Sequence, residues 1–239
     1  MRSPRDILIV LLLSFWPAVI AAQGSADSFF RKDFFPMEKG TYWIYQGTVK
    51  WQGGDDNNTK SKKVLVKMEV IDYFHKGEIS AALIKGHSAD LAWYDPQKKP
   101  GDYLIVRNGD RFYFLQDVSA LDGYRNLINS GEPPSEQHLF FVLPLKHGGH
   151  FCAADQPESP HGFYCWAVDR IRPVYLWGIE GIHSRKSTEY QLSYRTVPDQ
   201  EILYLASGIG ITRWIYGHHG TVSDVDVRLV RFHRAAESK

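Results

Sequence analysis

Short runs of β-branched and aromatic residues recur along this chain, each ended by glycine, proline, asparagine or aspartate. In residues 63–74 apolar and polar residues alternate, which is the pattern of a strand with one buried face. The runs follow one another at spacings of roughly 8–15 residues, which is typical of all-β folds and leaves no room for helical crossovers. The fold class is therefore predicted to be mainly β, an antiparallel curved sheet or a barrel-like architecture.

The predicted strands cover residues 41–51, 63–74, 78–88, 91–95, 103–109, 111–116, 138–145, 188–195, 201–207, 209–217 and 221–232. One short helix is predicted over 119–129, where Ser119 is a suitable N-cap. Four residues of this segment share one face of the helix, namely Leu121, Tyr124, Leu127 and Ile128.

The N-terminus has the order of parts of a secretory signal peptide. Arg2 and Arg5 precede an apolar run over residues 7–15, and small residues follow. The run is too short for a transmembrane anchor, which needs about 20 apolar residues. Residues 1–22 are therefore predicted to be a signal peptide cleaved between Ala21 and Ala26, which makes the protein secreted or periplasmic, with no transmembrane anchor in the mature chain.

The charge of the mature chain excludes one class of partner. Without residues 1–22, which hold Arg2, Arg5 and Asp6, the 28 Lys and Arg and the 27 Asp and Glu of the chain balance at 26 each. A neutral chain lacks the basic excess that binds phosphate backbones. No nucleic-acid partner is therefore expected.

Cys152 and Cys165 are the only cysteines. An even count in an exported protein indicates a disulfide, here across the base of a turn-rich hairpin. The alternative, a thiolate metal or redox pair, favours a shorter C-x-x-C spacing.

A weak internal repeat links two parts of the chain. Residues 35–43 and 143–151 share the pattern apolar–Pro–apolar–x–x–Gly–x–x–aromatic. Proline ends an edge segment, glycine supplies a turn, and the aromatic residue starts a strand. Trp43 and Phe151 are therefore both expected to point into the core.

The predicted domain boundaries follow from the signal peptide and from this repeat. Residues 28–234 are predicted to form a single secreted β domain, with two related halves at 28–137 and 138–234. Residues 235–239 are predicted to form a loose tail at the end of the chain.

Three segments carry a resemblance: FFPMEKGTYWIYQG near the start, LPLKHGGHF in the middle and SGIGITRWIYGHHGTVSDVDVRLV at the end. They resemble a loose group of uncharacterised bacterial secreted β proteins with a "PL-x-x-G-x-x-W-x-Y" opening and a late "GVG-φ" segment. Ser207 stands where that group tends to have proline. The resemblance implies one unit over most of the mature chain and implies no activity, cofactor or site residue.

Paired histidines beside glycines are the sharpest candidate for chemistry. His218 and His219 lie in a turn followed by Asp224, and His147 and His150 form a second pair in HGGH. Imidazole and carboxylate are ligands of Zn and Cu, so these five residues are a candidate metal site. The alternative is that turns tolerate histidine and that adjacent residues of a strand point to opposite faces.

No catalytic residue is predicted, because the chain lacks the G-x-S-x-G, S-x-x-K and H-E-x-x-H motifs. Most of its aromatic residues are expected in the core of a β domain, and a minority on one concave face would suit a carbohydrate, lipid or peptide ligand. The aromatic residues include Trp43, Tyr45, Trp51, Trp93, Tyr94, Trp166, Tyr175, Trp177 and Trp214.

Three functions remain open from the sequence. The leading interpretation is a non-catalytic secreted or periplasmic protein that binds an apolar or polymeric ligand or an envelope protein. The alternatives are a metal-dependent hydrolase that uses the His218/His219 turn and a structural scaffold component without a small ligand.

Overall fold

The computed structural model describes residues 34–52, 58–116, 121–152 and 162–236. The predicted signal peptide and the proposed N-cap Ser119 lie outside these residues. The strands are β1 (Tyr42–Gln52), β2 (Thr59–Lys76), β3 (Ile79–Lys85), β4 (Asp102–Asn108), β5 (Arg111–Leu115), β6 (Leu139–Val142), β7 (His150–Cys152), β8 (Cys165–Leu176), β9 (Arg185–Arg195), β10 (Asp199–Ala206), β11 (Gly210–His218) and β12 (Ser223–His233).

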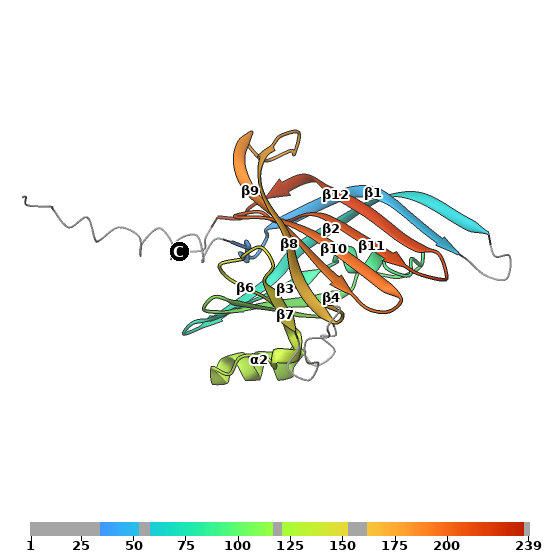
Figure 1. Ribbon diagram of the computed structural model, residues 1–239. Helices are drawn as coiled ribbons and strands as arrows, with labels where there is room; N and C mark the ends of the chain where they lie inside the picture. The colour runs from blue at the N-terminus through green and yellow to red at the C-terminus, as the bar shows by residue number, and fades with distance from the viewer. Residues whose placement is uncertain (1–33, 53–57, 117–120, 153–161, 237–239) are drawn as a thin grey trace, which may run out of the picture.

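All twelve strands belong to one antiparallel sheet with the order β6-β5-β4-β3-β2-β1-β12-β11-β10-β9-β8-β7. Consecutive strands pair with each other except β6 and β7, and β1 also pairs with β12 over residues 42–51. The sheet curls into a nearly closed barrel, as Figure 1 shows. The mainly β, barrel-like fold predicted from the sequence is confirmed.

The barrel is open between its two edge strands, β6 and β7, which have only four and three residues. Aromatic side chains span the opening, since the rings of Phe140 on β6 and Trp166 on β8 meet edge to face at 5.1 Å. The predicted disulfide between Cys152 and Cys165 is present and joins β7 to β8 at a paired position.

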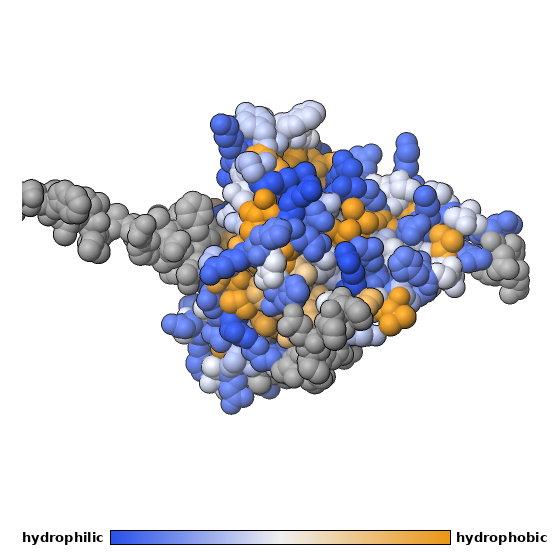
Figure 2. All heavy atoms as spheres, viewed as in Figure 1, coloured by the Kyte–Doolittle hydropathy of each residue, from blue (hydrophilic) through white to orange (hydrophobic). Residues whose placement is uncertain are grey.

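The alternation seen in the sequence sorts side chains between the two faces of the sheet. On β12, Val225, Val227 and Leu229 face inward and are buried, whereas Asp224 before Val225 and Arg228 before Leu229 are exposed. The outer surface consequently mixes hydrophilic residues with small apolar groups (Figure 2).

Two large rings of β1 cross the interior and fix β11. The Trp43 indole donates to the Ile209 carbonyl at 2.6 Å, and the Tyr45 hydroxyl donates to the Ile211 carbonyl at 2.9 Å. Because β12 lies between β1 and β11, these bonds tie together strands that do not pair with each other.

One end of the barrel is closed by the aromatic segment before β1. Phe34 and Phe35 are buried, and the Phe35 ring packs on Trp43 at 5.4 Å. Gly210 has φ +85°, and a Cβ there would lie 2.8 Å from the Phe35 ring, so only glycine fits. The segment therefore acts as an apolar plug for this end.

The helix α2 (Leu121–Ser130) lies outside the sheet, which confirms the predicted short helix. Its buried Ile128 belongs to a second, smaller core with the outward residues of β3, β4 and β5. Arg125 adds an ion pair to Asp72 of β2 at 2.7 Å. Among the residues that the structure describes, no helix is both long and apolar enough to cross a membrane.

The strand predicted over 91–95 is wrong. The chain forms a 3-10 turn, η2 (Ser88–Leu91), followed by an irregular segment; a second 3-10 turn, η3 (Glu136–His138), precedes β6. The His87 ring accepts from the Ala89 amide, and Asp90 accepts from the His87 amide, so this capping box overrides the apolar, aromatic pattern.

The two segments of the weak repeat both form turns with a glycine at positive φ, Gly40 at +90° and Gly148 at +76°. Trp43 is fully buried, and Phe151 is partly buried against the same core. They lead into strands of very different length, β1 and β7. The duplication of two halves stays a prediction.

Candidate functional site

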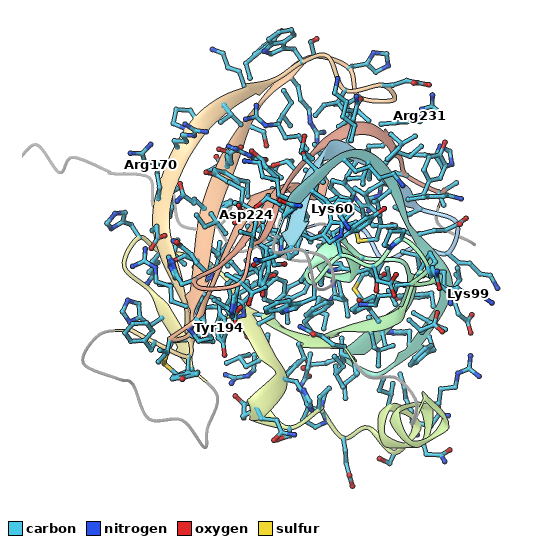
Figure 3. All side chains as sticks on the ribbon, turned by 90° about the vertical axis from the view of Figure 1, so that its right-hand side faces the viewer. Lys60, Lys99, Arg170, Tyr194, Asp224 and Arg231 are labelled. Carbon is cyan, nitrogen blue, oxygen red and sulfur yellow. A yellow bond between two sulfur atoms is a disulfide. The ribbon has the colours of Figure 1, made fainter. Side chains whose placement is uncertain are left out.

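At the end of the barrel opposite the plug, inward side chains are partly exposed to solvent. Four inward side chains at paired positions on β7 to β10 remain partly exposed: Phe151, Trp166, Tyr194 and Glu201. Two residues further in, the next inward row is no more than 1% exposed and consists of Val168, Leu192, Leu203 and Trp214. Solvent therefore enters as far as this row, which forms the floor. Figure 3 looks onto this end, with Tyr194 labelled near the end of β9.

We call Phe151, Trp166, Tyr194, Asp199 and Glu201 the mouth recess. Its wall on one side is aromatic, since the rings of Trp166 and Tyr194 lie 5.4 Å apart and Trp166 also contacts Phe140. Such a wall offers flat apolar surface to a ligand.

Glu201 supplies the first acceptor of the mouth recess. Its Oε1 accepts a hydrogen bond from the indole of Trp214 at 2.5 Å. Burial among the surrounding side chains and the negative charge of Asp199 raise the pKa of Glu201 to about 7, although the Trp214 bond opposes the rise. Near neutral pH this carboxyl therefore exchanges its proton readily.

Asp199 lies two residues earlier on the same face of β10, about 7 Å away along the strand. Burial opposes its charge, but hydrogen bonds from Tyr216 at 2.6 Å, from His218 at 2.9 Å and from Thr196 outweigh burial and lower the pKa of Asp199. Near neutral pH Asp199 is therefore ionised, whereas Glu201 is partly protonated.

Two aromatic residues near the mouth recess have left-handed backbones, Trp93 at φ 55° and Tyr164 at φ 63°. The Trp93 amide donates to the buried Ser223 hydroxyl at 3.0 Å, and its ring meets His218 at 4.4 Å. The Tyr164 amide donates to the Arg195 carbonyl at 2.7 Å. Both side chains stay partly exposed, although such a conformation is unfavourable for bulky residues.

The two carboxyls lead to opposite predictions for stability. Because the pKa of Glu201 is raised, its ionised carboxylate destabilises the folded protein. This destabilisation is absent below about pH 4.5 and complete above pH 7. We expect Glu201→Gln to raise the free energy of unfolding by about 2 kcal/mol at pH 8, after allowing for solvent screening, and to change it little at pH 4.5. Urea unfolding at the two pH values measures this.

Asp199→Asn is the matched control on the same strand. The pKa of Asp199 is lowered in the folded protein, so its negative charge stabilises the fold at neutral pH. This stabilisation is lost as the pH falls below the ordinary pKa of an aspartate. We expect Asp199→Asn to destabilise at pH 8. A Glu201→Gln variant that also destabilises at pH 8 would contradict the raised pKa of Glu201.

The structure separates the residues of the predicted metal site. His218 faces inward beside Asp199, whereas Asp224 lies on the outer face and is exposed. His219 is exposed in the turn after β11, and His147 and His150 are exposed beside β7, with three strands between β7 and β11. Within the described ranges, no three His, Cys, Asp or Glu side chains group as metal ligands. The Zn or Cu site stays a prediction.

A hollow of about 280 Å³ lies on the outer face of β1, β10, β11 and β12. Ile202 and Ile215 form its apolar part, and Lys50, Asp224 and Asp226 surround them. Asp226 is bound in a two-point ion pair by Arg213 at 2.6 and 2.9 Å. This groove has charged walls, and Tyr216 is the aromatic residue among those that line it.

Sequence reasoning missed Asp199, Glu201 and Tyr194. The sequence did contain an indication of Glu201. Residues two positions apart on a strand face the same side, so Glu201 shares a face with Leu203 and Leu205, and a carboxyl on the apolar side of a strand is unusual. His218 was singled out as a metal ligand, and the structure brings it to Asp199.

Comparison with known proteins leaves the function open. No family model and no curated protein matches this chain. One similar solved structure is a provisionally designated exported protein with a YmcC-like fold from Bacteroides fragilis, with 11% identity, a TM-score of 0.38 and coverage of 84% of this chain and 98% of that chain. Another is a provisionally designated lipoprotein from Parabacteroides distasonis, with the same identity and coverage and a TM-score of 0.39. At these values the likeness carries no argument about function.

Proposed function

We propose that this chain is an exported, non-catalytic binding protein whose mouth recess takes up a ligand with an apolar part and with hydrogen-bond donors. The observation that carries the proposal is the contrast between two inward rows. The outer row is aromatic and partly exposed, and the row beneath it is apolar and buried. A concave, mostly apolar site with a few polar groups is what small ligands and chain ends of polymers bind.

The chemistry of the lining supports the choice of ligand. Trp166 and Tyr194 offer ring faces, while Glu201 and Asp199 offer carboxylate oxygens. No cation is among the groups that shift the pKa of Glu201. A ligand that donates hydrogen bonds or carries a positive charge would therefore be favoured over an anion.

Export is supported by the predicted signal peptide and by the disulfide. Residues 1–22 have the composition of a signal peptide, and Cys152 is bonded to Cys165. A secreted or periplasmic location gives the recess access to envelope polymers, lipids and proteins.

Removing the aromatic wall should weaken uptake of an apolar probe. We expect Nile red to bind the mature chain with increased emission, and Trp166→Ala or Tyr194→Ala to weaken binding about three- to tenfold. Tyr73→Ala is the control, because Tyr73 is exposed on β2. Equal weakening by all three variants, or no saturable binding, would contradict the proposal.

One observation favours a second candidate function. Asp199 and Glu201 are neighbouring carboxyls whose pKa values are shifted in opposite directions, the arrangement that supplies an acid and a charged partner in glycoside hydrolysis. Turnover of 4-nitrophenyl glycosides that Glu201→Gln abolishes would establish this candidate. Absence of turnover from pH 4 to pH 9 would remove it.

A further inference from the structure

The hairpin of β8 and β9 projects beyond the body of the sheet and ends in residues 177–184 (Figure 1). Two large aromatic side chains are exposed at this end, Tyr175 at 56% and Trp177 at 72%. Tyr175 lies near the end of β8, and Trp177 directly follows its last residue, Leu176, so both are exposed at the tip. In Figure 2 this tip has the pale colours of intermediate hydropathy, with hydrophilic residues beside it.

The exposed tip is held in place by the rest of the fold. The Glu180 amide donates to the Val230 carbonyl and the Phe232 amide donates to the Glu180 carbonyl, both at 2.9 Å. Glu180 also pairs with Arg231 at 2.7 Å. Ile179 and Ile182 pack on the main core on either side of this contact. Trp177 is therefore presented to solvent by an anchored loop.

The charge beside these rings is positive. Lys186 is the cross-strand partner of Tyr175, and Arg185 is the partner of Leu176. Within residues 171–187 Glu180 is the sole acidic residue, and Arg231 neutralises it. Arg172 is paired with Glu189, which leaves Arg185 and Lys186 as the excess charge of the tip.

We propose that this tip, defined by Tyr175, Trp177, Arg185 and Lys186, docks on the surface of an anionic lipid bilayer. Tryptophan and tyrosine prefer the boundary between hydrocarbon and headgroups, and neighbouring lysine and arginine are attracted to anionic headgroups. The neutral charge of the mature chain as a whole hides this local excess. A rigid tip also loses little conformational freedom on docking.

Docking would leave the mouth recess facing away from the bilayer. Trp166 and Tyr175 lie nine residues apart on β8, which is about 30 Å along the strand. The lipid-docking proposal is independent of ligand uptake, and variants can separate the two.

The test is sedimentation of the mature chain with vesicles of POPC containing 30% POPG and with vesicles of POPC alone. We expect binding to the POPG vesicles that falls at 0.5 M NaCl. Tyr175→Ala with Trp177→Ala, and separately Arg185→Gln with Lys186→Gln, should each weaken binding about tenfold. Brominated lipid should quench tryptophan emission of the wild type and not of Trp177→Phe.

Leu65→Ala is the matched control, since Leu65 is 69% exposed on β2, and Trp166→Ala tests the recess. Both should bind vesicles like the wild type. Failure of the wild type to sediment, equal binding to POPC alone, or unchanged binding of the Tyr175/Trp177 variant with a native unfolding midpoint would each overturn the proposal. A tip that binds another protein or an acidic polymer would give the first of these results.

Discussion

Trp43→Ala should lower the free energy of unfolding by about 4 kcal/mol, the largest effect of any single substitution that we expect. Trp43 is fully buried, packs against Phe35 of the plug and Phe232 of β12, and donates to the Ile209 carbonyl. The variant would leave a cavity at the closed end of the barrel and would orphan a buried carbonyl. Urea unfolding followed by far-UV circular dichroism measures the loss.

Trp177→Ala is the matched control for size and residue type. Its side chain is 72% exposed, so the same substitution should change the free energy of unfolding by less than about 0.5 kcal/mol. A loss below about 1 kcal/mol for Trp43→Ala would mean that the plug and β11 do not depend on this ring.

Loss of the disulfide should have the second largest effect. Cys152 and Cys165 are 13 residues apart, and closing a loop of this size in the unfolded chain is worth about 3 kcal/mol. The bond also holds the three-residue edge strand β7 to β8. We expect Cys152→Ala with Cys165→Ala to lower the unfolding midpoint in urea accordingly.

The state of the two thiols gives an independent measurement. The mature chain, unfolded without reductant, should react with no thiol reagent, and after reduction it should react at both cysteines. Labelling of both cysteines before reduction, or an unchanged unfolding midpoint for the double variant, would contradict a stabilising bond.

Local pattern was enough to predict most of the strands. Alternation of apolar and polar residues indicated β2 and β12, and the turn at residues 108–110 indicated β4 and β5. The pairing of β1 with β12 could not be read in this way. It joins residues about 180 positions apart, such as Val49 and Val225, and nothing in either segment specifies its partner.

The errors have local physical causes. Residues 91–95 are apolar and aromatic like a strand, but the bonds made by His87 and Asp90 start a 3-10 turn before them. The burial of Phe34 and Phe35 was not predicted, since it requires the far end of β10 and the turn at Gly210.

The candidate site was harder to predict from the sequence than the fold. Carboxylates on strands usually face solvent, so Asp199 and Glu201 gave no motif. Only the register between β9, β10 and β11 shows that Glu201 stands between Tyr194 and Tyr216 on the inward face. The histidine pairs drew attention because of their spacing, and the structure places them on separate strands and turns.

Ligand uptake by the mouth recess is tested most directly by following the indole N–H signals of the six tryptophans of the mature chain by NMR during titration with phenethylamine at pH 8. This probe offers a ring to Trp166 and an ammonium group to Glu201, with an expected dissociation constant on the order of 1 mM. We expect the Trp166 and Trp214 signals to shift together and saturably, the Trp43 and Trp177 signals to stay in place, and Glu201→Gln to weaken the response. Shifts confined to Trp177, or no saturable shift at Trp166 and Trp214, would contradict a ligand-binding recess.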